Sequence, residues 1–132
     1  MRVRRARRED AATIVGFQVK MALETEDLRL DENTVRCGVE AVFDHPHKGY
    51  YYVAESEETV VGSLLTVHEW SDWRNGTVIW IHSVYVRPEA RRHGFYRKMY
   101  RYLQSLVNDS DELVGLRLYV DKRNQVLDLV GG

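Results

Sequence analysis

Residues 80–102, which read WIHSVYVRPEARRHGFYRKMYRY, constrain the fold of this chain more than any other segment. They begin as an apolar strand, turn at Pro88, pass through a basic loop that contains Gly94, and continue with the periodicity of an amphipathic helix. The first N–H groups of a helix have no partner within it, and the helix dipole adds partial positive charge there. A strand that leads into a helix through such a loop therefore predicts an anion-binding site.

The loop does not match the common phosphate-binding sequences, since it has neither the Gly-Lys-Ser/Thr of a P-loop nor the spaced glycines of a dinucleotide fold. The segment SVYVRPEARRHGFYRKMYRYL instead resembles the acetyl-CoA-binding motif of the GNAT superfamily of N-acetyltransferases. The motif's V-x-V-x-P matches Val84, Val86 and Pro88, and its Arg/Gln-x-x-Gly matches Arg91 and Gly94. The family motif ends in Gly or Ala two residues after this glycine, whereas this sequence has Tyr96 there.

Length and composition predict a single domain over residues 1–132, because 44% apolar residues are enough for one core. The net charge of -1 gives no reason to expect a nucleic acid or an anionic membrane as partner. The lone cysteine, Cys37, excludes an internal disulfide and is typical of a reducing compartment. No apolar run approaches membrane-spanning length, and the N-terminus lacks the apolar stretch of a signal peptide. We therefore expect a cytoplasmic location.

The N-terminal sequence MRVRRARRED has two interpretations, a basic arm for nucleic acid or a short first strand with solvated arginines. Glu9 and Asp10 favour the strand, because they stand where a helix pattern begins and carboxylates are stabilising at the positive end of a helix dipole. We predict a strand at residues 2–6 that is followed by a helix.

The remaining patterns predict the element order β-α-α-β-β-β-α-β. The first helix runs from Ala11 to about Glu24, and Asp31 is the N-cap candidate of a second helix that ends near Pro46. Further strands are predicted at residues 50–55, 60–70, 77–86 and 113–120, and the third helix ends near Val107. This order resembles the GNAT core, which implies an α/β domain with a mixed, mostly antiparallel sheet and helices on both faces. The fourth and fifth strands are expected to splay and open a V-shaped slot.

The C-terminal end departs from the family pattern. GNAT proteins continue after the fifth strand with a helix that carries a Tyr and with further strands, whereas this sequence ends in QVLDLVGG. We expect the C-terminal elements to be missing or altered, which leaves the outer edge of the fifth strand open. An open edge favours pairing with a second chain, so we expect a homodimer.

The resemblance implies acetyl-CoA as the cofactor and indicates where it binds. The strand at Val84, Tyr85 and Val86 is expected to hold the pantetheine arm through backbone hydrogen bonds. The pyrophosphate is expected on the loop that follows, at Arg91, Arg92, His93, Gly94, Phe95 and Tyr96. Asn124 matches the Asn that contacts the cofactor near the thioester in relatives.

His82 is the candidate catalytic base. Strand alternation places it on the same face as Val84, and several GNAT enzymes for small amines carry a Glu or His at the matching position. A His titrates near neutral pH and can take a proton from an ammonium group. The competing interpretation is an ordinary strand histidine. No metal site is predicted, because His45 and His47 have no third ligand nearby in the sequence.

Two acidic clusters are candidates for binding the amine acceptor. Carboxylates and aromatic rings suit a cationic amine, through ion pairing and cation–π contact. Each cluster is equally consistent with a solvated loop, or with tryptophans that pack in a core or an interface. The residues are Glu24, Glu26 and Asp27 after the first helix, and Glu69, Trp70, Asp72 and Trp73 in the sequence EWSDW.

These observations predict an N-acetyltransferase that moves an acetyl group from acetyl-CoA to a primary amine of a small molecule. The resemblance implies direct attack by the amine, without a covalent enzyme intermediate. The alternative is a non-catalytic acyl-CoA-binding or regulatory module, which Tyr96 and the unrecognised C-terminal Tyr favour. Catalysis is favoured by the retained Arg91 and Gly94 together with His82 and Asn124.

Overall fold

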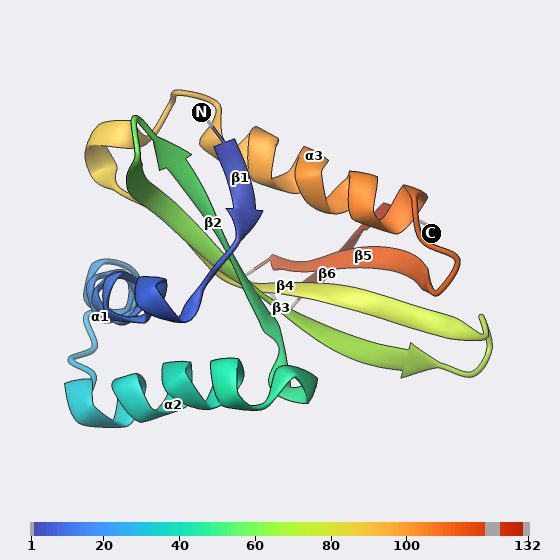
Figure 1. Cartoon of the computed structure of the whole chain (residues 1–132), viewed down its shortest axis with the longest axis horizontal. Helices are drawn as coiled ribbons and strands as arrows, with labels where there is room; N and C mark the ends of the chain where they lie inside the picture. The colour runs from blue at the N-terminus through green and yellow to red at the C-terminus, as the bar shows by residue number, and fades with distance from the viewer. Residues whose placement is uncertain (1, 121–124, 131–132) are drawn as a thin grey trace.

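The computed structural model describes residues 2–120 and 125–130, and for residues 119, 120 and 125–130 it describes the backbone alone. Figure 1 shows a twisted sheet with helices on both faces. Single 3₁₀ turns lie at Arg8–Asp10, Pro46–Lys48 and Pro88–Ala90. No helix in this part of the chain is long and apolar enough to cross a membrane. In chain order the strands and α-helices are β1 (Arg2–Arg5), α1 (Ala11–Glu26), α2 (Glu32–Asp44), β2 (Tyr50–Ser56), β3 (Thr59–Ser71), β4 (Gly76–Val86), α3 (Phe95–Asn108), β5 (Leu113–Val120) and β6 (Gln125–Val130).

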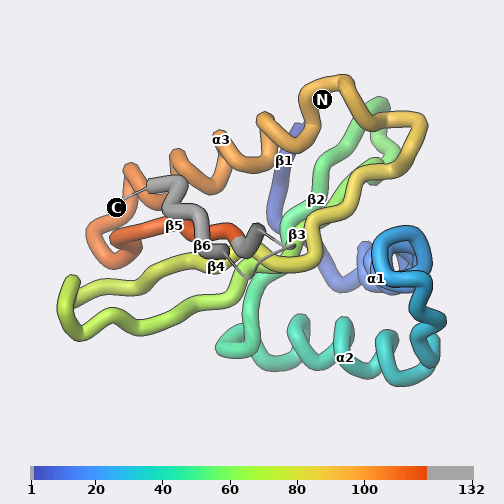
Figure 2. The backbone as a smooth tube through the Cα atoms, turned by 180° about the vertical axis from the view of Figure 1, so that it is seen from behind, coloured from blue at the N-terminus to red at the C-terminus, as the bar shows by residue number. Residues whose placement is uncertain are grey.

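The six described strands form one sheet in the order β1-β2-β3-β4-β5-β6. Every neighbouring pair is antiparallel except β4 and β5, which run parallel. Helices α1 and α2 cover one face and α3 covers the other (Figures 1 and 2). The predicted element order through β5 and the mixed, mostly antiparallel sheet are therefore confirmed.

Strand β6 has no counterpart among the predicted strands. It pairs antiparallel with β5, from Gln125 opposite Val120 to Val130 opposite Leu116. The expectation that the outer edge of β5 is open is therefore wrong, because β6 occupies that edge. The homodimer that was inferred from the open edge stays a prediction.

The N-terminal arginines are part of the fold. Arg4 is buried and binds both carboxylate oxygens of Asp10, at 2.9 and 3.1 Å, and its guanidinium also reaches Glu55 of β2 at 3.2 Å. Asp10 accepts a further hydrogen bond from the backbone N–H of Arg7 at 2.7 Å. Burial opposes ionisation of Asp10, but the hydrogen bonds from Arg4 and Arg7 lower its pKa. The network holds β1 to β2 and to the start of α1, which supports the strand interpretation of this segment.

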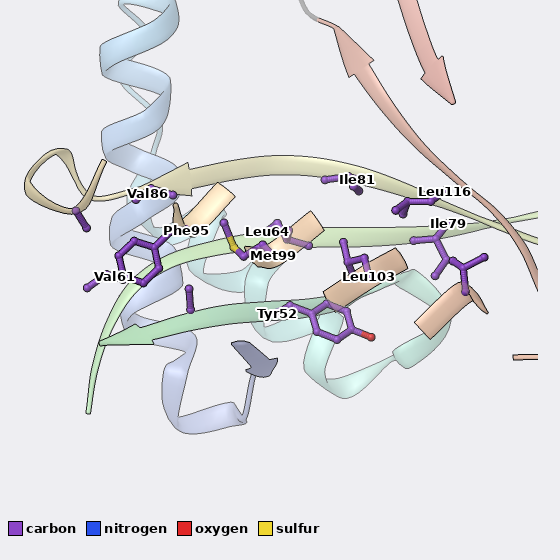
Figure 3. Packing of buried hydrophobic residues seen from close by; sticks show 13 residues of the cluster. Tyr52, Val61, Leu64, Ile79, Ile81, Val86, Phe95, Met99, Leu103 and Leu116 are labelled. Atoms are coloured by element: carbon purple, nitrogen blue, oxygen red, sulfur yellow. The ribbon is translucent and has the colours of Figure 1, made fainter. Parts of the chain in front are cut away.

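Two apolar cores lie on opposite faces of the sheet. Strand alternation in β2 directs Tyr52 toward α3 and Tyr51 toward α1 and α2. On the α3 side, shown in Figure 3, Phe95, Met99 and Leu103 recur every four residues and so line one face of the helix. This packing fixes the start of α3 against the end of β4.

A bulge interrupts β4 where it pairs with β3. Opposite the single residue Leu64 of β3, strand β4 has two residues, Ser83 and Val84. Ser83 adopts the left-handed conformation, with φ 53°. Pairing between β4 and β5 ends at Ile81 opposite Leu118, although β4 continues beyond this point. The two strands therefore separate, as predicted, and Figure 3 shows their ribbons diverging.

The bulge also changes the orientation of His82. Ile81 and Val84 both pack into the core beneath α3, although residues three apart point to opposite faces of a regular strand. His82 follows Ile81 and faces the α1 side, where Tyr85 contacts Phe17. The prediction that His82 and Val84 share a face is wrong, because the extra residue of the bulge reverses the alternation.

The left-handed conformation of Ser83 can be tested by stability. Ser83→Gly should raise the free energy of unfolding by up to about 1 kcal/mol, because glycine adopts positive φ without steric cost. Ser83→Val should lower it by about 1–2 kcal/mol. Urea denaturation followed by circular dichroism measures both. The control is Thr77→Gly in the same strand, because Thr77 is not among the positive-φ residues. Its free energy of unfolding should fall by about 0.5–1 kcal/mol. An equal decrease in the free energy of unfolding of Ser83→Gly would contradict the positive φ at the bulge.

Candidate functional site

A cleft of about 560 Å³ opens where β4 separates from β5. Its walls come from α1 and the α1–α2 connection on one face of the sheet, and from α3 on the other. The cleft therefore reaches both faces. A space of this size accepts a small molecule or the narrow arm of a larger one. The lining includes Met21, Thr25, Glu26, His82, Val84 and Tyr100.

His82 lies on the wall of the cleft, beside the bulge. Burial lowers the pKa of His82 below its ordinary value of 6.5, because desolvation disfavours the charged imidazolium. The imidazole is therefore neutral near pH 7, which is the form that accepts a proton. At this position it can serve a group bound in the cleft.

The other predicted strand residues contribute in different ways. Val84 lines the cleft, whereas the side chains of Tyr85 and Val86 are buried and leave only their backbone for a ligand. The ring of Tyr85 lies 5.0 Å from that of Phe17, and its hydroxyl is buried without a hydrogen-bond partner among the described residues. Burial and the nearby charge of Glu24 raise the pKa of Tyr85, so the hydroxyl keeps its proton at neutral pH.

The loop between β4 and α3 has the geometry of an anion site. Arg92 and Gly94 are left-handed, with φ 69° and 83°, and α3 begins directly after Gly94. The N–H of Lys98 donates to the C=O of Gly94 at 3.0 Å, so the amides of the first turn that precede it have no partner within the helix. A Cβ at Gly94 would meet no heavy atom within 4 Å, so a ligand can approach this backbone from solvent. Free amides with open access suit a phosphate group.

The remaining loop residues divide into buried and exposed. Phe95 is buried in the core beneath α3, so its backbone alone can contact a ligand. Arg92, His93 and Tyr96 are exposed, as expected of residues beside a solvent-accessible anion. Asn124 lies outside the described residues. Within the described part of the chain, no cluster of three or more His, Cys, Asp and Glu could hold a metal ion.

Arg91 lies against α1 instead of extending from the loop. Its Nε donates to the backbone C=O of Val86 at 2.8 Å, and its Nη2 donates to Glu24 at 2.8 Å. The guanidinium carbon is 5.4 Å from the centre of the Tyr85 ring. The hydrogen bond to Glu24 raises the pKa of Arg91. A residue predicted for the cofactor thus forms an ion pair with one predicted for the acceptor.

The first acidic cluster reaches the cleft through one side chain. Glu26 lines the cleft, whereas Glu24 is bound to Arg91. Asp27 ends α1 in the left-handed conformation, with φ 51°, and its backbone N–H donates to the C=O of Ala22.

The second acidic cluster lies elsewhere. Glu69 accepts a hydrogen bond from Trp80 Nε1 at 3.0 Å, while Trp70 and Trp73 at the end of the β3–β4 hairpin are 64% and 96% exposed. Asp72, beside them, is also exposed. Figures 1 and 2 show this hairpin end and the α1–α2 connection at opposite ends of the molecule. The two predicted clusters therefore do not form one site.

Tyr100 of α3 also lines the cleft and was not among the site residues predicted from the sequence. Burial raises the pKa of Tyr100, so its hydroxyl stays protonated at neutral pH. Tyr100 and Tyr102 are both partly buried against the core of α3, and the helical period does not distinguish them. The separation of β5 from β4 is what brings Tyr100 to the wall of this cleft.

Similarity to known proteins agrees with this geometry. The model of the Acetyltransferase (GNAT) family matches residues 18–126. The chain is 40% identical to a possible acetyltransferase from Clostridium difficile 630, over 93% of this chain and 81% of that one, with a TM-score of 0.87. Among curated proteins, none is significantly similar to this chain.

Two more distant structures share the fold. A predicted acetyltransferase from Clostridium acetobutylicum, solved with acetyl-CoA, is 15% identical over 94% of this chain and 83% of that one, with a TM-score of 0.66. A ribosomal-protein-alanine N-acetyltransferase from Brucella melitensis biovar Abortus 2308 is 12% identical over 92% and 81%, with a TM-score of 0.72. The family match covers most of the sequence and includes both the cleft and the loop between β4 and α3, so this chain belongs to the GNAT acetyltransferase family.

Proposed function

We propose that this protein is an N-acetyltransferase that transfers the acetyl group of acetyl-CoA to a primary amine of a small molecule, in the cytoplasm. One observation carries the proposal. The cleft between β4 and β5 has a neutral histidine on its wall, and β4 leads from this cleft into an open loop at the start of α3. Acetyl transfer needs these parts together, a base for the amine and a place for the phosphates of the donor.

The residues present fit acetyl-CoA. Beyond Ile81 no strand that the structure describes pairs with the edge of β4 that faces β5, so this edge suits the amides of a pantetheine arm. The left-handed Gly94 and the free amides of α3 suit the pyrophosphate. A relative of the same fold was solved with acetyl-CoA. The bound donor supplies an activated thioester, and every other part of the proposal concerns residues of this chain.

The amine would enter from the α1 side of the sheet. There the cleft is lined by Met21, Ala22, Leu28 and Leu30, with Glu26 as an acidic side chain. A single carboxylate beside aliphatic walls suits a small molecule with one ammonium group. Because Trp70 and Trp73 lie at the far end of a hairpin, the predicted aromatic wall is not part of this proposal.

His82 would take the proton of the attacking amine. An ammonium group has no lone pair, so it must lose a proton before it can attack the thioester carbonyl directly. His82 is on the α1 side, where the amine would lie, and its lowered pKa keeps the ring neutral. The bulge directs His82 toward the α1 side of the sheet and Val84 toward the opposite side, which supports this proposed role.

The first prediction from this proposal concerns the cofactor. Gly94→Glu should abolish acetyl-CoA binding, because it places bulk and negative charge where phosphate approaches the amides. Gly38→Glu is the matched control, since Gly38 is exposed on α2 with no heavy atom near its Cβ position. Isothermal titration calorimetry with acetyl-CoA compares the two variants. Unchanged affinity in folded Gly94→Glu would contradict this placement of the cofactor.

The second prediction concerns the base. His82→Ala should lower kcat with primary amines by about 10²-fold or more and leave acetyl-CoA affinity nearly unchanged. In the unaltered protein kcat/KM should fall as the pH decreases through the lowered pKa of His82, below 6.5, because protonation removes the base. Thiol release from acetyl-CoA, measured over a panel of amines and across pH, gives both profiles.

The matched control is His68→Ala. His68 is a second strand histidine with a pKa lowered by burial, but it packs on Tyr50 away from the cleft. This variant should keep the turnover and the pH profile of the unaltered protein. Full turnover of His82→Ala at every pH would show that another group takes the proton. Tight acetyl-CoA binding without turnover of any amine would favour the non-catalytic acyl-CoA-binding module.

A further inference from the structure

The ion pair between Glu24 and Arg91 joins the two ends of the candidate site. Glu24 lies in the last turns of α1, directly before Thr25 and Glu26, which line the acceptor side of the cleft. Arg91 lies 67 residues later, in the loop whose amides suit a phosphate. The pair is therefore a direct contact between the segment that borders the acceptor and the segment that borders the cofactor.

Two hydrogen bonds and one ring contact hold the guanidinium of Arg91 in place. Nε binds the C=O of Val86 at the end of β4, Nη2 binds Glu24 on α1, and the planar group lies over the Tyr85 ring. Two acceptors on different elements fix the orientation of a guanidinium, which is rigid and planar. Phe17 packs against the same Tyr85, so the floor of this contact is apolar.

The charge of Arg91 is also compensated. A carboxylate 2.8 Å away reduces the attraction that the guanidinium would exert on a nearby phosphate. Attraction for an anion at this loop then comes from the amides at the start of α3 and from exposed Arg92. The contacts of Arg91 are those of a structural connection and not those of a phosphate ligand.

We propose that Arg91 is a positioning residue that ties the phosphate loop to α1 through Glu24, so that cofactor binding depends on a carboxylate from the acceptor side. This inference rests on the proposed function for the identity of the ligand. It differs from the expectation drawn from the sequence motif, in which Arg91 contacts the phosphate itself.

The two roles predict opposite effects of the same substitution. If Arg91 contacts phosphate, Glu24→Ala frees the guanidinium and removes a negative charge, so acetyl-CoA affinity stays equal or rises. If Glu24 holds Arg91 and the loop in place, Glu24→Ala weakens binding about three- to tenfold, as does Arg91→Ala. The double variant should then bind no more weakly than the weaker single variant, because both changes break one contact.

Conservative variants separate geometry from charge. Glu24→Gln keeps an oxygen that accepts a hydrogen bond from Arg91, so it should retain most of the affinity. Arg91→Lys keeps the charge but cannot bind Val86 and Glu24 with one rigid group. Its acetyl-CoA affinity should therefore fall as much as that of Arg91→Ala. Glu32→Ala is the matched control, because it removes a carboxylate that pairs with Arg36 at 3.5 Å on the exposed side of α2.

The experiment is an acetyl-CoA titration of these variants, with hydrogen exchange of the ligand-free proteins as a second readout. Glu24→Ala and Arg91→Ala should each speed exchange in both the last turn of α1 and residues 87–96, and Glu32→Ala should do neither. Unchanged or tighter binding of Glu24→Ala, full affinity of Arg91→Lys, or exchange that is unaltered in the partner segment would each overturn the proposal. If the unaltered protein binds no acetyl-CoA, the proposed function fails, and hydrogen exchange still decides whether the connection exists.

Discussion

The extra residue in β4 is the constraint on which the rest of the site depends. Two residues of β4 opposite Leu64 bend the strand and reverse its alternation, so that β4 leaves β5 beyond Ile81. The opening between the strands is the cleft, and the reversal places His82 on one face of the sheet and Val84 on the other. A serine at positive φ costs about 1–2 kcal/mol, which the packing of α3 on this strand must offset.

Two ion pairs connect helix α1 to other elements of the fold. Arg4 joins the first strand to the start of α1 through Asp10, and Arg91 joins the loop after β4 to the end of α1 through Glu24. Helix α1 is thus fixed at both ends by a guanidinium from another element. The groups that we propose for the chemistry are the neutral imidazole of His82 and the backbone amides of α3.

Most of the fold follows from local signals in the sequence. Asp31 caps α2 by accepting a hydrogen bond from the N–H of Thr34 at 3.1 Å, and the predicted bounds of β5 are those observed. The bulge has no such signal, because Ser83 is neither glycine nor flanked by one. The contact of Glu24 with Arg91 depends on how α1 packs on the sheet, which local periodicity cannot give. Strand β6 was missed because QVLDLV does not alternate regularly.

The order of the sheet has a consequence for how the protein folds. Strands β2, β3 and β4 are joined by short hairpins, so their pairing closes only small loops and needs little loss of chain entropy. The parallel contact of β4 with β5 closes a longer loop that contains α3, which costs more chain entropy. We therefore expect the wall of the cleft that belongs to β5 to assemble after the hairpins that contain β4. A molecule bound across that wall would select the complete chain over its partly folded forms.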